Sequence, residues 1–191
     1  MDGPVHPEGG PSEGPRAPRR SDLSRLAAEL NRLGARYLIV GGFAMIEAGF
    51  PRLTSDIDLL IDPSPDNEGR VFEALRSLPD RAVDALQAGD VARFRVVRVG
   101  DEIVVDLLEN SCGVTYADAV RDCVFREIDG VRIPFASPET LWRMKQTVRE
   151  KDIPDRLFLR QLLDASGAPD SRREKRPIQR RPWWKRFLPG P

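Results

Sequence analysis

The sequence feature that most restricts the fold of this chain is a pair of aspartates within an apolar run. Asp56 and Asp58 alternate with aliphatic residues in the stretch SDIDLLI at residues 55–61. Successive side chains of a strand point to opposite faces, so both carboxylates are expected on one face, about 6.6 Å apart along the strand. The stretch therefore predicts a strand with one buried apolar face and one acidic face.

Further apolar runs, separated by glycine, proline and aspartate, predict the other elements. Strands are expected at residues 37–40, 91–99, 102–108, 123–128 and 131–135, and helices at 21–33, 43–48, 66–78, 138–150 and 152–165. Ser21 and Asp152 are the predicted N-caps of the first and last helices. This order of elements predicts an α/β (α+β) fold, in which helices flank a mixed central sheet and C-terminal helices pack on it.

Composition divides the chain into a head, a domain and a tail. Residues 1–20 hold five prolines and four glycines, which is typical of disorder, whereas residues 21–167 hold all the predicted elements. Residues 168–191 form a basic tail with eight Lys or Arg and two Asp or Glu. Because the whole chain has no net charge, the domain itself is acidic, which indicates a need for cations.

The tail combines its basic residues with Trp183 and Trp184. Such mixtures are typical of segments that stack on bases and hold phosphates, so RNA is a candidate partner. Docking to a membrane or to a partner protein and a plain unstructured end are the alternatives.

Several function classes are excluded by what the sequence lacks. Cys112 and Cys123 are the only cysteines, and His6 is the only histidine. A disulfide framework, a zinc site and a histidine-activated nucleophile are therefore not expected. No apolar run approaches the roughly 20 residues that span a bilayer, and the N-terminus lacks a signal-peptide pattern. We therefore expect a cytoplasmic protein without a transmembrane segment.

A third acidic residue extends the predicted site. Asp106 lies in the apolar run at residues 103–108, where an unpaired charge is costly to bury. If its strand lies beside that of Asp56 and Asp58, three carboxylates meet, and their oxygens favour Mg²⁺ or Mn²⁺. Such a trio can hold two ions about 3.5–4 Å apart, as in-line phosphoryl chemistry requires. A structural salt bridge from Asp106 to a nearby arginine is the alternative.

Two glycines precede the aspartates. Gly41 and Gly42 follow the predicted strand at residues 37–40 and open the next helix. Glycines let backbone N–H groups approach phosphate oxygens, and a helix N-terminus favours anions. The pair therefore predicts a phosphate-binding turn, with an ordinary turn as the alternative.

In this arrangement the chain resembles the DNA polymerase beta-type nucleotidyltransferase superfamily, and more closely its small bacterial members related to abortive-infection nucleotidyltransferase toxins. The resemblance covers about residues 30–163. Its motifs are Gly41-Gly42, Arg52-Leu53-Thr54 before the two aspartates, Asp106 in a later strand, and Lys145 followed by Lys151-Asp152-Ile153-Pro154-Asp155. The wider superfamily often has serine where this chain has Gly42, so phosphate binding here would depend on backbone N–H groups and basic side chains.

The resemblance implies the nucleotidyltransferase fold and transfer of a nucleoside monophosphate from an NTP to an acceptor hydroxyl, with release of pyrophosphate. Asp56 and Asp58 would hold two metal ions, and Asp106 would hold one and help to deprotonate the acceptor. The implied nucleotide-binding residues are Gly41, Gly42, Arg52, Thr54, Lys145 and Arg149. For Lys145 and Arg149, one helical turn apart in the predicted helix, a solvated helix face is the alternative.

The acceptor is open between tRNA or other RNA, a protein and a small molecule, and a toxin–antitoxin role follows only from the resemblance. A non-catalytic nucleotide- or RNA-binding protein, or an antitoxin-like partner, is the second hypothesis. A nuclease that uses the same three carboxylates is weaker, because the glycine turn would have no role.

Overall fold

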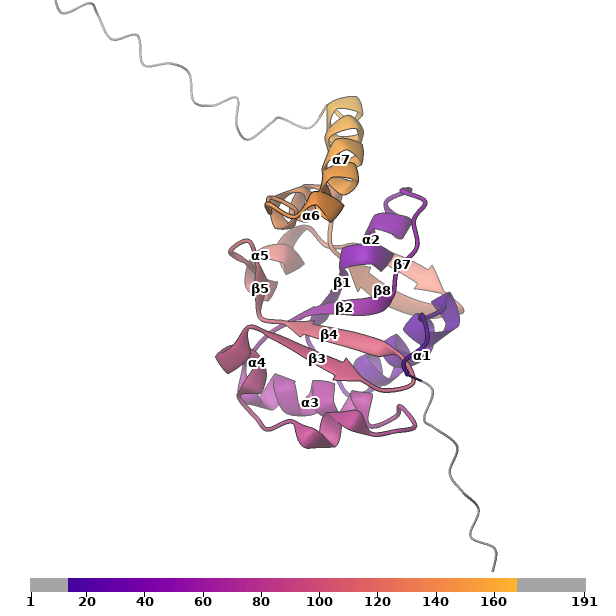
Figure 1. Cartoon of the computed structure of the whole chain (residues 1–191), viewed down its shortest axis with the longest axis vertical. Coiled ribbons are helices and arrows are strands. Elements are labelled where there is room, and N and C mark those ends of the chain that lie inside the picture. Colours follow the sequence, from indigo (N-terminus) through magenta and orange to yellow (C-terminus); the bar gives the residue numbers. More distant parts are fainter. Residues whose placement is uncertain (1–13, 168–191) are drawn as a thin grey trace, which may run out of the picture.

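The computed structural model of this chain describes residues 14–167. Residues 1–13 of the predicted head and the whole predicted tail, residues 168–191, lie outside the described residues. Within the described part, six strands form one mixed sheet in the order β3-β4-β2-β1-β8-β7, and β5 and β6 form a small second sheet. The predicted α/β fold with a mixed sheet is confirmed (Figure 1).

The strands of the large sheet alternate between parallel and antiparallel neighbours. Pairs β1–β2, β3–β4 and β7–β8 are antiparallel, whereas β2–β4 and β1–β8 are parallel. The strand bounds are β1 Tyr37–Val40, β2 Asp56–Ile61, β3 Val96–Gly100, β4 Val104–Leu108, β5 Asn110–Ser111, β6 Val114–Thr115, β7 Val124–Ile128 and β8 Val131–Phe135.

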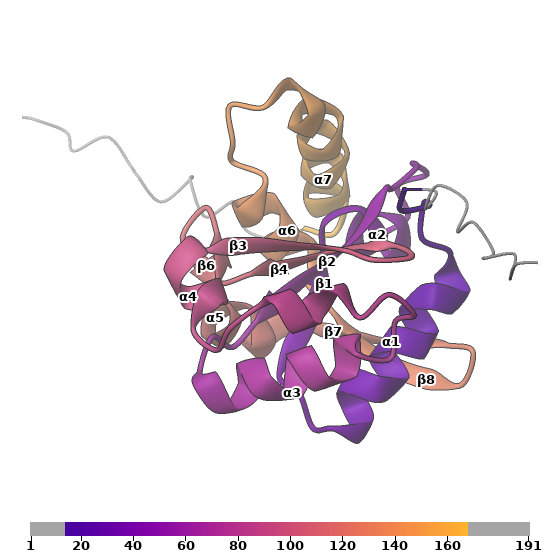
Figure 2. The same cartoon turned by 60° about the horizontal axis from the view of Figure 1, so that its bottom comes forward.

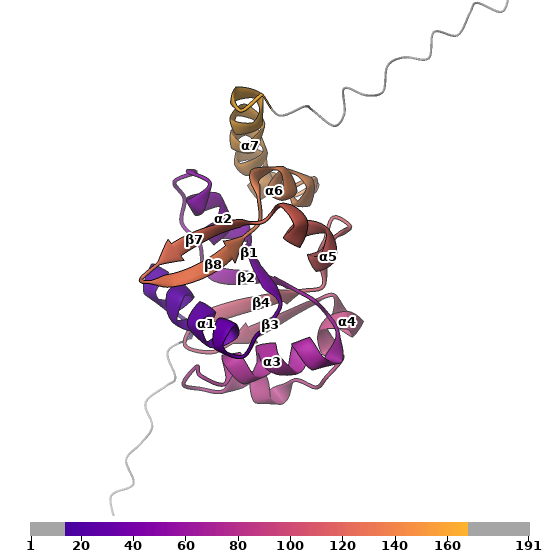
Figure 3. The ribbon, with the colours of Figure 1, turned by 180° about the vertical axis from the view of Figure 1, so that it is seen from behind.

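The α-helices are α1 Arg20–Arg32, α2 Gly41–Glu47, α3 Pro65–Leu75, α4 Asp90–Phe94, α5 Tyr116–Ala119, α6 Pro138–Met144 and α7 Ile153–Ala165. Short 3-10 turns are η1 Ala82–Ala85, η2 Val120–Asp122 and η3 Glu150–Asp152. Helices α1 and α3 lie side by side on one face of the sheet, and α2, α6 and α7 lie toward the other (Figure 2). Figure 3 shows α7 stacked on α6 at the far end, away from the sheet.

The core lies between the sheet and helices α1 and α3. Ile57, Leu59 and Ile61 of β2 are fully buried, as the alternating pattern predicts. In α1, Leu23, Leu26 and Leu30 are buried and form its apolar stripe. None of the helices within residues 14–167 has the length and apolar character needed to cross a membrane.

The predicted strand at residues 91–99 is wrong in its first half, where residues 90–94 form helix α4. The cause is a contact from α3: the buried Glu68 carboxylate accepts hydrogen bonds from the backbone N–H groups of Gly89 and Val91, the latter at 2.8 Å. A carboxylate that satisfies these free N–H groups stabilises a helix start. Strand β3 therefore begins only at Val96.

The predicted helix at residues 138–150 is also too long, since α6 ends at Met144. Residues 145–149 leave the helix and wrap around Asp152, whose carboxylate accepts hydrogen bonds from Lys145, Thr147 and Arg149. Asp152 is the N-cap residue of α7, as predicted, but its side chain makes no cap hydrogen bond. Lys145 and Arg149 consequently do not share one helix face.

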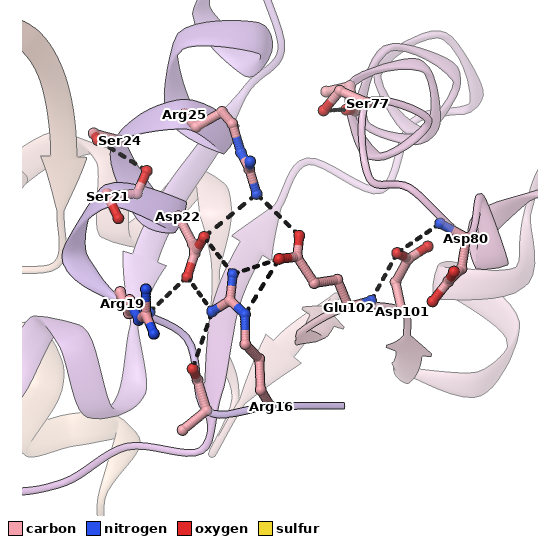
Figure 4. Close-up of polar contacts among 12 residues, drawn as sticks. Arg16, Arg19, Ser21, Asp22, Ser24, Arg25, Ser77, Asp80, Asp101 and Glu102 are labelled. Atoms are coloured by element: carbon pink, nitrogen blue, oxygen red, sulfur yellow. Dashed lines mark hydrogen bonds and ion pairs between the residues drawn. The ribbon is translucent and has the colours of Figure 1, made fainter. Parts of the chain in front are cut away.

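The described part of the predicted head, residues 14–20, is attached to the rest of the structure. Arg16 donates its backbone N–H to the Glu102 carbonyl at 2.9 Å, and its guanidinium bonds both Asp22 and Glu102 (Figure 4). Residues 14–20 thus attach to the turn between β3 and β4. The Asp22 carboxylate also accepts from the Arg19 N–H at 2.7 Å, and Arg19 is the N-cap residue of α1, so the predicted Ser21 cap is wrong.

Candidate active site

Pairing of β2 with β4 brings the three predicted aspartates together. The strands are parallel, and Asp58 lies directly opposite Asp106 in register. Asp56 is two residues before Asp58 on the same face of β2. Side chains opposite one another in neighbouring strands share a sheet face, so all three carboxylates meet on the face away from α1 and α3.

A cavity of about 200 Å³ opens over these carboxylates. Its lining includes the three aspartates and five further predicted residues, namely Gly41, Gly42, Arg52, Lys145 and Arg149. Thr54 is the one predicted site residue that does not line it. The structure thus places an acidic strand surface opposite a basic wall from the loop before β2 and from the segment after α6.

The glycine turn touches the acidic strand directly. Gly41 has φ +59°, and a Cβ atom there would lie 1.8 Å from Asp58 Oδ2. A Cβ atom on Gly42 would lie 2.2 Å from Thr54 Oγ1. Neither position therefore has room for a side chain, and the Thr54 hydroxyl fills the space beside Gly42. Thr54 itself donates to the Asp56 carbonyl at 3.1 Å, which fixes the entry into β2.

The acidity of Asp58 is perturbed by its surroundings. Burial raises its pKa to about 6, and the neighbouring charges of Asp56 and Asp106 act in the same direction. The Gly42 backbone N–H, which hydrogen-bonds the Asp58 carboxylate, and the Lys145 charge lower the pKa but only in part. The site therefore holds more negative charge than its neighbours neutralise.

Arg98 of β3 is the residue that the sequence interpretation missed. Its register places it opposite Asp106, and its Nε and Nη2 donate to Asp106 Oδ1 and Oδ2 at 2.8 and 2.7 Å. The same Nη2 lies 3.2 Å from Asp56 Oδ2. These carboxylates raise the pKa of the Arg98 guanidinium above its usual value, with the hydrogen bond to Asp106 as the largest cause. The salt bridge that was the alternative for Asp106 is therefore present.

The carboxylate oxygens fit Mg²⁺ or Mn²⁺ by their chemistry, since both ions prefer oxygen donors. Within residues 14–167, however, no three acidic, cysteine or histidine side chains stand ready to surround one ion. Two of the three aspartates are instead engaged with Arg98.

On the basic wall, two aspartates of the last motif are paired with cations. Lys145 Nζ lies 3.0 Å from Asp152 Oδ1 and 2.9 Å from Asp155 Oδ2. Arg52 Nη1 lies 2.6 Å from Asp155 Oδ2, and Arg149 Nε lies 2.9 Å from Asp152 Oδ2. Burial opposes ionisation of Asp152, but hydrogen bonds from Thr147 and Lys145 outweigh it and lower the pKa of this carboxyl. The network thus holds Arg52, Lys145 and Arg149 at the cavity.

Two solved structures are similar to this chain. A fungal structure, an antigenic nucleotidyltransferase-like protein from Paracoccidioides brasiliensis, is 21% identical over 75% of each chain, with a TM-score of 0.46. A protein of Thermotoga maritima, provisionally assigned as a nucleotidyltransferase, is 15% identical over 75% of this chain and 91% of its own, with a TM-score of 0.44. No curated protein matches the sequence.

The sequence model of a family described as "Nucleotidyl transferase of unknown function (DUF2204)" matches residues 19–170. This match spans the whole sheet, the glycine turn, the three aspartates and the basic wall. The chain belongs to this nucleotidyl transferase family.

Proposed function

We propose that the protein is a divalent-metal-dependent nucleotidyltransferase that moves an NMP from an NTP to an acceptor hydroxyl. The observation that carries this proposal is the register of Asp58 with Asp106, which gathers three carboxylates under a cavity whose opposite wall is basic. Carboxylates and cations facing one another are what a metal-bound triphosphate requires. Family membership supports the reaction class.

The chain's own residues divide this work by charge. Asp56 and Asp58 would hold two Mg²⁺ or Mn²⁺ ions, and Asp106 would share one and accept the proton of the acceptor hydroxyl. The metal, when bound, supplies neutralisation of the charge that develops on the phosphoryl oxygens. Lys145, with Arg52 and Arg149, would bind phosphate oxygens. The acceptor oxygen forms its bond to the α-phosphorus as the bond to pyrophosphate breaks.

The phosphate-binding residues differ in how firmly they are held. Lys145 bridges two buried carboxylates and points its charge at the cavity from a fixed position. The Arg149 side chain is 55% exposed and pairs with Asp152 through Nε, and its guanidinium has further N–H donors that suit a phosphate. Thr54 would act indirectly, by setting the position of Asp56. An RNA acceptor, tRNA included, remains part of this proposal through the basic tail, and a toxin-like role remains part of it through the family resemblance alone.

A specific observation favours a second candidate, a protein that binds nucleotide without turning it over. Arg98 neutralises Asp106 and Asp56, as a structural salt bridge in a non-catalytic descendant would. In that case NTP binds the basic wall and no label reaches any acceptor.

The test is transfer of label from each α-labelled NTP to total RNA, to lysate protein and to small-molecule acceptors, with Mg²⁺ and with Mn²⁺. The full-length protein should label one fraction, and Asp58→Ala should abolish the labelling. Asp80→Ala, which removes an exposed carboxylate outside the cavity, serves as the matched control and should label normally. Nucleotide binding without labelling of any fraction would favour the second candidate instead.

A further inference from the structure

We propose that Arg98 is a built-in counter-ion of the carboxylate site, which occupies the place of a divalent cation until that cation and the nucleotide displace it. The inference rests on the proposed function, because it concerns the metal that this function needs. It adds a positioning residue on β3, a strand that none of the sequence motifs includes.

The first argument is the row of side chains across three strands. Arg98 of β3 faces Asp106 of β4, and Asp106 faces Asp58 of β2. Cross-strand neighbours share one sheet face, so the guanidinium has no route away from the carboxylates except outward into solvent. Its placement is a consequence of strand register and needs no loop rearrangement.

The second argument is that Arg98 uses the atoms a metal would use. It engages both oxygens of Asp106, and through Nη2 it also approaches Asp56 Oδ2. A guanidinium remains protonated at any physiological pH, so it cannot leave these oxygens by losing its charge. An ion that is to bind between Asp56 and Asp106 must therefore displace it.

The third argument is that displacement is easy. The Arg98 side chain is 62% exposed, whereas those of Asp106 and Asp56 are 11% and 23% exposed. β3 forms the edge of the sheet, so no further strand covers it. Ion pairs with a well-exposed partner contribute little to stability in water, which makes their exchange reversible. The buried carboxylates stay in place while the exposed cation moves.

Arg98 also lines the cavity itself, so it remains beside the site after it leaves Asp106. There the coplanar N–H donors of its guanidinium match the oxygens of a phosphate group. A nucleotide that takes Arg98 removes the competitor of the metal, and a metal that takes Asp106 frees Arg98 for the nucleotide. Metal and nucleotide are thereby expected to strengthen each other's binding, since such coupling is reciprocal.

The experiment measures Mn²⁺ binding to the nucleotide-free protein by the loss of the free-ion EPR signal. Arg98→Gln should bind Mn²⁺ up to about fivefold more tightly than the wild type, because loss of a competing pair of this kind is worth up to about 1 kcal/mol, or a factor of about five. Arg98→Lys, which keeps a charge but not the fork, should fall between them. Arg126→Gln, an equal loss of charge on the exposed opposite edge strand β7, should stay within about twofold of wild type.

A second measurement adds a non-hydrolysable NTP. It should tighten Mn²⁺ binding more in the wild type than in Arg98→Gln, in which the competitor is already gone. Unchanged or weaker Mn²⁺ binding by a folded Arg98→Gln overturns the inference, because it would mean that Arg98 supports the carboxylates instead of competing for them. Tighter metal binding without transfer of label by any variant keeps the inference and rejects the proposed catalysis. If the protein transfers label but Arg98→Gln leaves the Mn²⁺ affinity unchanged, the proposed catalysis is kept and the inference about Arg98 is rejected.

Discussion

Two groups of aspartates, one that lines the cavity and one that pairs with the cations lining it, have their charges balanced in opposite ways. Asp152 and Asp155 are each 1% exposed, and three cations lie within ion-pair distance of them. Asp56, Asp58 and Asp106 have only Arg98 as an ion-pair partner among the described residues, and Arg98 is mostly exposed. The pKa of Asp152 is lowered, whereas that of Asp58 is raised.

This difference separates a structural scaffold, the network of Asp152 and Asp155, from the candidate site of Asp56, Asp58 and Asp106. In the Asp152–Asp155 network, removal of a buried carboxylate takes a partner from cations that are themselves partly buried and should cost stability. At Asp58, removal of a carboxylate relieves repulsion and should increase stability. The fold therefore leaves negative charge unbalanced at the three aspartates of the proposed metal site and balances it at Asp152 and Asp155, which position the cations of the cavity.

The largest effect should come from the scaffold. Asp155→Asn leaves Arg52 and Lys145 without one of their partners, and we expect the free energy of unfolding to fall by about 3 kcal/mol. For a domain of this size the melting temperature should drop by about 6–12 °C, measured by calorimetry. Asp164→Asn, which removes a 63% exposed partner of Arg160, is the control and should change stability by less than about 1 kcal/mol. Equal effects of the two variants would remove the distinction between scaffold and surface.

The turn that touches the site should be nearly as sensitive. Gly41→Ala forces a side chain into a positive-φ position and against Asp58 Oδ2, so we expect a loss of about 2–3 kcal/mol and little remaining transfer activity. Thermal unfolding and label transfer measure the two effects.

Gly42→Ser provides a sharper version of the same test, because its Cβ would overlap Thr54 Oγ1 and Cβ. Thr54→Gly in the same chain removes both atoms and should restore much of the lost stability. No recovery in the double variant would mean that the overlap with Thr54 is not the cause of the loss.

At the three-aspartate site, loss of a carboxylate should raise the free energy of unfolding instead of lowering it. The pKa of Asp58 in the folded protein is about 6, above its ordinary value of 3.8, so its ionisation destabilises the fold as pH rises through 6. Asp58→Asn avoids this loss, and we expect the metal-free variant to gain about 1–2 kcal/mol at pH 8. The gain should shrink below pH 6 and vanish near pH 4. Melting temperatures in EDTA from pH 4 to 8 measure it, with Asp80→Asn as an exposed control. If Asp58→Asn were less stable than the wild type at pH 8, ionised Asp58 would not be a source of instability in the metal-free protein.

The smallest effect on stability is expected at a third charged cluster, which is formed by Arg16, Asp22 and Glu102. Arg16→Ala removes the partly exposed link between Asp22 and Glu102, and we expect the melting temperature to fall by about 2–4 °C. The loss should decrease at high salt, whereas that of Asp155→Asn should not, because a buried pair is screened less. Identical salt dependence in the two variants would mean that salt screens the Asp155 ion pairs as strongly as those of Arg16.

Much of this arrangement follows from local sequence patterns. Alternation in residues 55–61 identifies both the core face of β2 and the shared face of its aspartates, and the apolar run around Asp106 predicts its strand. The turn at Gly41-Gly42 is predicted as well, although the close contacts that require glycine there involve Asp58 and Thr54, which lie later in the chain.

Arg98 escaped prediction because its position depends on a hairpin register. A two-residue turn at Gly100-Asp101 would place Arg98 opposite Ile103. The buried Asp101 carboxylate instead bonds the backbone N–H groups of Asp80 and Ala82, which widens the turn. Arg98 then faces Asp106. Such a contact between distant segments, like that of Glu68 with α4, leaves no local pattern in the sequence.

The attachment of residues 14–20 has a practical consequence for anyone who prepares this protein. Composition invites a truncation at Ser21, yet that cut would delete Arg16 and its hydrogen bonds to Glu102. Glu102 belongs to the turn that joins β3 to β4, the hairpin that carries Arg98 and Asp106. A shortened protein would therefore report metal affinities for a loosened hairpin, and an affinity tag is better separated from Gly14 by a linker than fused at residue 21.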